Sequence, residues 1–205
     1  GLRAVAGYAK PRPTFVAAGS RSSASNGAVT INKPTGVTTG DLMIAFYTVD
    51  NNAQTWTPDT GWTEILDYGT TRPSAGVSYK IATASEPTTY TFSSSTGGSS
   101  VSGGILAYRG AAYDTIGTMG ATTSGTSVVA PSITVSTNNS ILIGGFSQGG
   151  TSSSTFTAPT GMTIRNDQTN IRIALAMYDE NVNSGSTGTR TMTSNNNNYL
   201  VGVLI

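Results

Sequence analysis

The sequence predicts an all-β protein, folded as an antiparallel sandwich or barrel. Three observations lead to this class. Ser, Thr, Gly and Asn supply nearly half of the 205 residues, and only 10% are charged, against about 25% in an average soluble domain. Short runs rich in Val, Ile, Thr, Tyr and Phe recur between Gly, Pro, Asn or Ser clusters, which is typical of strands and turns. Several runs of the first half also return about 100 residues later, which indicates two related halves.

The expected strands follow from these runs and their boundaries. Alternation with period two in 89–93 and 189–193 predicts half-buried strands. No segment carries the sustained stripe of an amphipathic helix. The four asparagines at 195–198 and the connection 109–127 are interpreted as loops. The expected strands, in order, are residues 28–31, 41–49, 62–68, 76–82, 89–93, 103–108, 132–135, 141–146, 162–165, 171–178, 189–193 and 199–205.

The internal repeat spans about residues 28–113 and 126–205. Its clearest frame is Thr60-Gly61-Trp62-Thr63, which returns as Thr160-Gly161-Met162-Thr163. Two such units could form two small sandwiches or one larger double-sheet sandwich. We favour one domain over residues 19–205, because the connection between the halves lacks the Pro-rich or charged character of a linker.

Residues 1–18 are expected to form an extended N-terminal arm. Pro11 and Pro13 forbid a helix there, and 14–18 is an apolar, extended stretch that could add a strand to a neighbouring sheet. A frayed terminus is the alternative. The arm is basic yet carries apolar side chains, so it could dock on a partner, and the candidate contact residues are Arg3, Tyr8, Lys10, Arg12 and Phe15.

Composition excludes several kinds of chemistry. The chain has no His and no Cys, which removes imidazole bases, thiolate nucleophiles, and zinc sites built on these residues. A net charge of +1 gives no basis for nucleic-acid binding by counterion release. No run of about 18 apolar residues would span a membrane, and residues 1–7 are too short for an intact signal peptide. We expect no catalytic residues, no cofactor and no metal.

Two weaker site hypotheses remain. Trp56 and Trp62 could stack on sugars, but their counterparts in the second half are Phe156 and Met162, which favours core filling. Asp179 and Glu180 form the one adjacent acidic pair. They could bind Ca²⁺ together with nearby asparagines, although the loop pattern of a calcium site is missing and a solvated loop is the simpler interpretation.

Five runs give the sequence a family resemblance: Gly-Asp-Leu-Met-Ile-Ala (40–45), Gly-Trp (61–62), Ser-Tyr-Lys-Ile-Ala (78–82), Ser-Glu-Pro-Thr-Thr-Tyr-Thr-Phe (85–92) and Gly-Ile-Leu-Ala-Tyr-Arg-Gly (104–110). This series resembles a β-rich module of bacteriophage virion proteins, both head decoration and tail-fibre components, and of bacterial surface proteins. The resemblance covers about residues 28–205. It implies a jelly-roll type of sandwich without a known catalytic residue set.

Two functions follow from the resemblance. The first is a virion structural protein, a capsid decoration or cement subunit bound to the major capsid protein or another virion protein. By analogy with icosahedral shells it would be a homo-oligomer, with a trimer favoured. The second is an adhesive or glycan-binding module of a tail fibre or cell surface. The expected location is accordingly the virion, with an extracellular or cell-surface position as the alternative.

Overall fold

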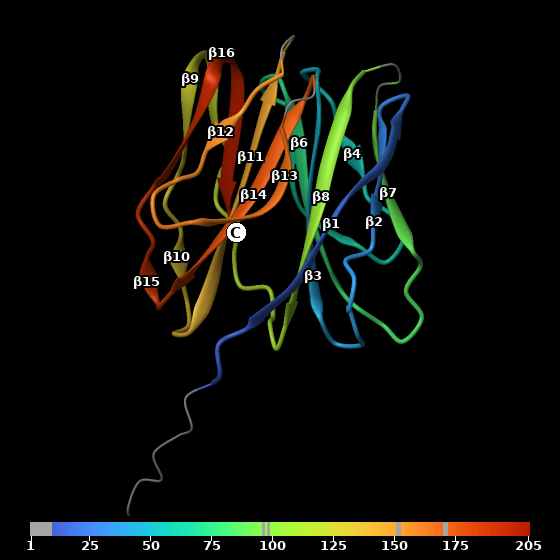
Figure 1. Ribbon diagram of the computed structural model, residues 1–205, viewed down its shortest axis with the longest axis vertical. Helices are drawn as coiled ribbons and strands as arrows, with labels where there is room; N and C mark the ends of the chain where they lie inside the picture. The colour runs from blue at the N-terminus through green and yellow to red at the C-terminus, as the bar shows by residue number, and fades with distance from the viewer. Residues whose placement is uncertain (1–9, 96, 98, 151–152, 170–171) are drawn as a thin grey trace, which may run out of the picture.

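The computed structural model describes residues 10–205 except 96, 98, 151–152 and 170–171. Within these residues every regular element is a strand, as the sequence predicts (Figure 1). The strands are β1 (Thr14–Ser25), β2 (Ala28–Asn32), β3 (Leu42–Val49), β4 (Trp56–Thr57), β5 (Thr63–Tyr68), β6 (Ser74–Ile81), β7 (Thr89–Ser94), β8 (Val101–Arg109), β9 (Gly120–Ala130), β10 (Thr134–Val135), β11 (Ser140–Gly149), β12 (Phe156–Thr157), β13 (Thr163–Gln168), β14 (Ala174–Val182), β15 (Gly185–Ser186) and β16 (Arg190–Leu204).

The first half is one curled antiparallel sheet. Its strand order is β4-β7-β2-β1-β8-β3-β6-β5. The curl brings β2, β7 and β4 over β8 and β3, because the long strand β1 pairs with β8 along its first part and with β2 along its second. The result is a two-layered sandwich that is almost closed, with β4 and β5 as its edge strands.

The second half repeats this strand order, but β9 takes the place of both β1 and β2, and β16 takes the place of both β7 and β8. Its sheet runs β12-β16-β11-β14-β13, and β9 pairs with β16. The start of β16 pairs with the end of β9, as β7 pairs with β2, while the end of β16 pairs with the start of β9, as β8 pairs with β1. Each long strand also has a glycine where a carbonyl group passes closely: a Cβ at Gly19 would lie 1.9 Å from the Asn32 carbonyl oxygen, and a Cβ at Gly120 would lie 1.8 Å from that of Val129. The structural repeat therefore includes β1 and β9.

Three apolar clusters hold the two halves. One lies inside the first sandwich and contains Trp62, and one lies inside the second and contains Met162. The third fills the space between the sandwiches, with Leu106 and Val203 among its members. Trp62 and Met162, which occupy the variable position of the Thr-Gly-x-Thr frame, are 7% and 8% exposed. Their expected burial at matching positions is confirmed.

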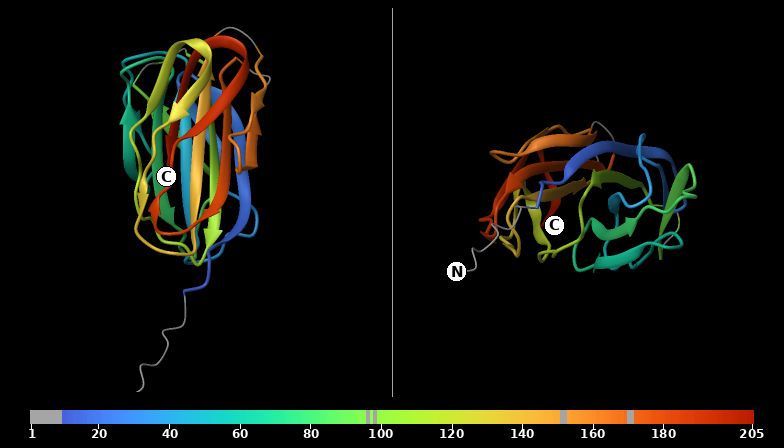
Figure 2. Two further views of the ribbon diagram at one scale, coloured as in Figure 1. Left: turned by 90° about the vertical axis from the view of Figure 1, so that its left-hand side faces the viewer. Right: turned by 90° about the horizontal axis from the view of Figure 1, so that it is seen from below.

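Strand β3 shows how the halves share a core. Its whole run from Leu42 to Val49 is buried. Met43 and Tyr47 face the core of the first sandwich, while Leu42 and Phe46 face the second half. Both faces are covered, which explains a continuous apolar run in place of the alternation of a half-exposed strand. Figure 2 shows the two curled halves side by side, the first in blue to green and the second in yellow to red.

Buried polar contacts fix how the halves sit on each other. The Thr48 and Ser147 hydroxyl groups lie 3.0 Å apart, and the Tyr108 hydroxyl donates to Asp179 Oδ2 at 2.9 Å. Because an unpaired buried polar group is costly, sliding one sandwich along the other would be opposed at each of these contacts. The result is an all-β antiparallel sandwich, as expected, in which each half forms its own curled sheet and both share a central core.

Three sequence interpretations need correction. Residues 120–130 form strand β9, although the connection 109–127 was expected to be a loop. The four asparagines at 195–198 lie within β16 and not in a loop. Thr14–Ala18 begins β1 and pairs with β8 of the same chain, from Thr14 opposite Arg109 to Ala18 opposite Leu106. This stretch is therefore part of the sandwich, because its edge that faces β8 is already paired within the chain.

Candidate functional site: the N-terminal segment and the cleft between the halves

Three of the five candidate arm residues lie close together at one end of the sandwich. Lys10 and Arg12 belong to the segment that leads into β1, Phe15 lies in β1, and Arg3 and Tyr8 lie outside the described residues. Lys10 is exposed and the other two are half-buried. Lys10 lines one hollow together with Pro11 and Pro13, whereas Arg12 and Phe15 line another.

Arg12 attaches this segment to the second half. Its Nη1 donates to the carbonyl oxygens of Ser140 at 2.5 Å and Val182 at 3.2 Å, and its Nη2 donates to Asn139 Oδ1 at 3.4 Å. The Asn139 amide donates in turn to the Lys10 carbonyl oxygen at 3.1 Å. Residues 10–13 therefore cross from the second half to β1, which lies in the first.

Phe15 is held inside the chain as well. It pairs with Tyr108 across β1 and β8, and the two rings meet edge to face at 5.7 Å between centroids. The Arg165 guanidinium lies over the Phe15 ring, 4.4 Å from its centroid. Such a contact is attractive because the ring face carries negative charge. Arg12 and Phe15 therefore contribute to the joint between the halves, and any arm for a partner lies before Thr14.

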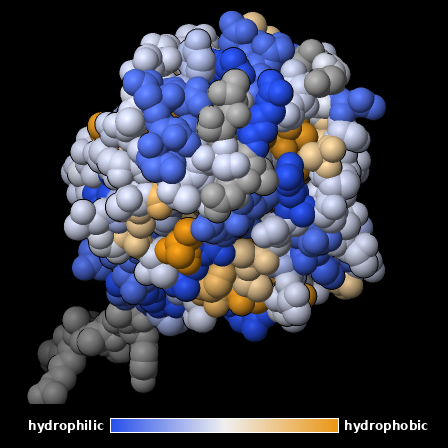
Figure 3. Space-filling model, turned by 45° about the horizontal axis from the view of Figure 1, so that its top comes forward, coloured by the Kyte–Doolittle hydropathy of each residue, from blue (hydrophilic) through white to orange (hydrophobic). Residues whose placement is uncertain are grey.

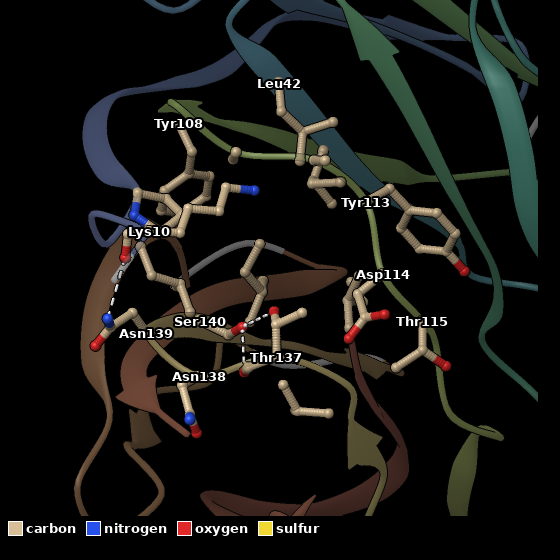
Figure 4. A pocket seen from close by; sticks show the side chains of 18 of the residues that line it. Lys10, Leu42, Tyr108, Tyr113, Asp114, Thr115, Thr137, Asn138, Asn139 and Ser140 are labelled. Carbon is tan, nitrogen blue, oxygen red and sulfur yellow. Dashed lines mark hydrogen bonds between the residues drawn. The ribbon is translucent and has the colours of Figure 1, made fainter. Parts of the chain in front are cut away.

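A cleft opens beside this segment, between the two halves (Figure 4). Its volume is about 90 Å³. The floor is apolar and combines Leu42 and Tyr108 from the first half with Ile143 and Ile205 from the second. Pro11 and Pro13 form part of its wall. An apolar hollow with a polar rim is the usual form of a binding pocket.

The polar groups on the rim of the cleft differ in whether they are already hydrogen-bonded within the chain. The Asp114 carboxylate accepts hydrogen bonds from the Ser136 backbone N–H at 2.8 Å and the Ser136 hydroxyl at 2.7 Å. The Ser140 hydroxyl is bonded to Thr137. Lys10 is exposed at the mouth. The cleft and the basic N-terminal segment thus form one continuous end of the molecule.

Within the described residues, five of the ten Asp and Glu side chains form ion pairs. Ion pairs join Asp41 to Arg109, Asp50 to Arg72, Glu86 to Lys80, Asp179 to Arg165 and Glu180 to Arg190. Asp179 and Glu180 lie in β14, and each has its own arginine partner, so they form neither the solvated loop nor the shared Ca²⁺ site considered above. Successive strand residues point to opposite faces, which separates the two carboxylates.

Glu64 and Asp67 on β5 are the nearest approach to a catalytic acid pair. Burial raises the pKa of Glu64, and the neighbouring Asp67 raises it further. Burial also raises the pKa of Asp67, although the Trp56 backbone N–H donates to its Oδ2 and opposes the shift. Both residues are exposed on the first half, away from the cleft. A raised pKa suits a general acid, but neither side chain lines the cleft between the halves.

The tryptophans are core residues. Trp56 is 5% exposed and Trp62 is 7% exposed, and both pack in the first sandwich against aromatic partners. Neither offers a flat face to a sugar. The sequence preference for core filling over a carbohydrate platform is confirmed, and it rested on the replacement of these rings by Phe156 and Met162 in the second half.

Among the described residues, no group of three or more His, Cys, Asp or Glu side chains could hold a metal ion. The same part of the chain contains no helix with the length and hydropathy needed to cross a membrane. Comparison with protein-family models, with curated proteins and with solved structures finds no match for this chain.

Proposed function

We propose that the chain is a virion structural protein, a capsid decoration or cement subunit that binds a protein lattice through the end formed by the N-terminal segment and the cleft. The observation that carries the proposal is this shared end. Exposed Lys10, the proline-lined wall and an apolar floor lie next to one another on a rigid double sandwich. The resemblance to phage virion modules supports the choice of a capsid as the lattice.

The character of the surface agrees with a role in protein–protein contacts. The net charge is +1, and proteins of low net charge associate readily. Large apolar side chains on the surface are few and scattered, and within the described residues they are Ile81, Val129, Ile164 and Tyr199. Figure 3 accordingly shows a polar face with small orange patches. Association through such a surface would depend on the end that carries Lys10 and the cleft, here called the attachment end, and on the sheet edges. It would not need a large apolar interface.

Oligomer formation belongs to this proposal. Strands β4, β5, β12 and β13 end their sheets, and the edge of a sheet can pair with a neighbouring copy. Thr14–Ala18 is already paired with β8, so an arm exchanged between copies would have to come from residues before Thr14. We favour a trimer on the particle, by analogy with threefold positions of icosahedral shells. The chain performs no catalysis in this proposal.

The direct test uses particles of the encoding phage that lack this protein. Purified chain is added, and bound protein is measured by cosedimentation. The full chain should bind until a fixed number of sites is filled, while a variant that lacks residues 1–9 and also carries Lys10→Gln should remain folded, because the contacts of Arg12 and Phe15 are kept, and should bind at least about tenfold more weakly. Lys33→Gln removes one positive charge away from the cleft and should bind normally. Undiminished binding of the shortened chain would contradict the attachment end.

The second candidate is an adhesive or glycan-binding module. Burial of Trp56 and Trp62 removes the sugar platform first considered for it. A different observation, a polar hollow at the opposite end of the sandwich, favours it and is developed next.

A further inference from the structure

The end of the sandwich opposite the attachment end carries a second hollow. Strand β8 connects the two ends, because Arg109 pairs with Thr14 at one and Val101 pairs with Val49 at the other. Eight residues of a strand separate these pairs by roughly 27 Å. The hollow has a volume of about 550 Å³ and lies directly beyond Val49, and its lining comes from both halves: Asp50, Asn51, Asn52, Thr70, Thr71, Arg72, Ser99, Thr123 and Tyr199.

The charge at the hollow comes from Asp50 and Arg72, which line it, and from Arg172, which lies beside it and is bonded to Asp50. Asp50, whose side chain is 1% exposed, accepts from Arg72 Nε at 2.7 Å and Nη2 at 2.8 Å, and from Arg172 Nε at 3.3 Å. A guanidinium has five N–H groups. Asp50 therefore engages two of those on Arg72 and one of those on Arg172, which is 64% exposed. The local sum of charges is +1, so the hollow favours an anion.

An aromatic ring forms one wall. Tyr199 is 36% exposed and carries the Arg72 guanidinium 5.4 Å from its ring centroid. The strand that positions it pairs Tyr199 with Gly149. A Cβ at Gly149 would lie 2.6 Å from Asp50 Oδ1, so glycine allows the second half to approach the ion pair closely. Arg72 and Tyr199 are therefore held together from different halves.

The rest of the lining is hydroxyl and amide groups. Thr70, Ser99 and Thr123 each present a hydroxyl, and Asn51 and Asn52 present amides. These groups both donate and accept hydrogen bonds, which suits a ligand with many hydroxyl groups. The hollow thus combines an exposed ring, a surplus positive charge and mixed hydrogen-bonding groups, whereas the cleft at the other end has an apolar floor.

We propose that this hollow binds an acidic saccharide, a sugar that carries a carboxylate. The sugar ring packs against Tyr199, its carboxylate pairs with the guanidinium groups of Arg172 and Arg72, and its hydroxyl groups bond to the threonine and asparagine side chains. A polyanion such as nucleic acid is disfavoured, because the net charge of the chain is only +1. The site lies at the end opposite Lys10, so a subunit attached as proposed would present it outward. Saccharide binding does not require the lattice, so either proposal can fail alone.

The test is an NMR titration of the isotopically labelled full chain. The acidic probes are 3′-sialyllactose and trigalacturonic acid, and the controls are lactose, which is neutral, and sodium acetate, which carries the charge without the sugar. Binding of at least one acidic probe should shift the amide signals of residues 50–52 and 70–72 and of Tyr199. Lactose and acetate should each bind at least about tenfold more weakly than that probe.

Variants separate the two contacts. Arg172→Gln and Tyr199→Ala should each weaken binding by about tenfold, as expected for the loss of one charge-assisted contact or one stacked ring. Tyr199→Phe keeps the ring and should bind within about threefold of the original chain, and Lys33→Gln should bind equally well. An unchanged amide spectrum of each variant away from the substitution confirms that it is folded.

Three results would overturn the proposal. The first is the absence of shifts at the hollow with both acidic probes at about 10 mM. The second is equal binding of lactose or of acetate, which would remove the acidic or the saccharide part of the ligand. The third is undiminished binding by Arg172→Gln and Tyr199→Ala, which would place the ligand elsewhere.

Discussion

Replacement of Tyr108 by phenylalanine tests the polar joint between the halves. The Tyr108 hydroxyl is buried and donates to Asp179 Oδ2 at 2.9 Å, and Arg165 Nε donates to Oδ1 of the same carboxylate at 2.9 Å. Tyr108→Phe removes one hydroxyl, while the ring can keep its edge-to-face contact with Phe15. It leaves Asp179 in place with the bond to Arg165.

The size of the effect follows from this geometry. A hydrogen bond to a charged group contributes about 1.5–3 kcal/mol, so Tyr108→Phe should lower the free energy of unfolding by about 2 kcal/mol. For a chain of this length that corresponds to a Tm lower by roughly 4–8 °C. Asp179→Ala should cost more, about 3 kcal/mol, because it leaves both Tyr108 and Arg165 without this partner.

Tyr178→Phe is the matched control. The Tyr178 hydroxyl is also buried, but it has no hydrogen-bond partner in the structure. Its removal deletes an unsatisfied polar group, so the free energy of unfolding should change by less than about 0.5 kcal/mol or should rise. Both changes remove the hydroxyl of a buried tyrosine, and only that of Tyr108 is bonded to Asp179.

The assay is urea unfolding observed with two probes. Both tryptophans, Trp56 and Trp62, lie in the core of the first half, so their fluorescence reports that half, while far-UV circular dichroism reports both. If the halves unfold as one unit, the two probes give coincident transitions. Asp179 lies in the second half, yet Asp179→Ala should shift the tryptophan transition by the same amount as the dichroism transition.

The reasoning would be refuted by two separate dichroism transitions with an unchanged tryptophan midpoint in Asp179→Ala. It would equally be refuted by Tyr108→Phe and Tyr178→Phe having the same effect. The first result would mean that the halves are stable independently. The second would mean that the bond between Tyr108 and Asp179 contributes nothing.

Three further predictions concern the cores, acid stability and assembly. Trp62→Ala and Met162→Ala should lower the free energy of unfolding by about 3–5 and 2–5 kcal/mol, measured by urea unfolding; a loss below about 1 kcal/mol at either position would contradict its role in a core. Burial would raise the pKa of Glu86, but hydrogen bonds from Lys80, the Thr83 backbone N–H and hydroxyl, and Tyr90 outweigh it and lower the pKa to about 2. Because the folded-state pKa of Glu86 is lowered, its ionised carboxylate stabilises the protein above pH 4.5, and this stabilisation is lost as the pH falls toward 2. Glu86→Gln should therefore lower the free energy of unfolding at pH 7 by up to about 3 kcal/mol. It should also flatten this part of the acid-unfolding curve. The pKa of Glu64 is raised, so folding disfavours its ionised form and Glu64→Gln should not destabilise at pH 7. A larger loss of stability in Glu64→Gln than in Glu86→Gln would contradict these two pKa shifts. Sedimentation at high concentration, free and after release from particles, should reveal a homo-oligomer with a trimer favoured, and a strictly monomeric chain in both states would exclude it.

The strands that the sequence predicted best are those that enter an apolar core. The run 42–49 and the alternating run 89–93 were recognised because buried side chains leave a clear pattern. Strand β9 was missed because its first eight residues, Gly120–Ser127, are Gly, Ala, Thr and Ser, and its pairing with β16 depends on backbone hydrogen bonds that carry no side-chain signal. The asparagines at 195–198 likewise show no apolar pattern, so the sequence predicts a loop where the structure has part of β16.

The arrangement of the halves left a signal that could have been used. Both faces of β3 and β8 are apolar, and a single two-layered sandwich needs only one such face per strand. The second apolar face pointed to a further layer, which is the core between the halves. Thr14–Ala18 was assigned to an exchangeable arm because an extended apolar stretch looks the same whether its partner strand belongs to the same chain or to a neighbour.

The candidate site was predictable only in part. Lys10, Arg12 and Phe15 were selected from the sequence by charge and aromatic character, and they do lie together. The cleft floor joins Leu42, Tyr108, Ile143 and Ile205, which are far apart in sequence and become neighbours only when the two halves pack. The hollow around Asp50 likewise needs Thr123 and Tyr199 from the second half.

The most direct test of the central proposal is to look for this chain in virions purified from a culture that produces it, and to measure its copy number against the major capsid protein by quantitative mass spectrometry. A decoration subunit that covers the shell should be present in a fixed, high ratio to the major capsid protein, and should remain attached to heads separated from tails. Absence from the particles, or only a few copies that separate with the tails, would contradict a capsid decoration role.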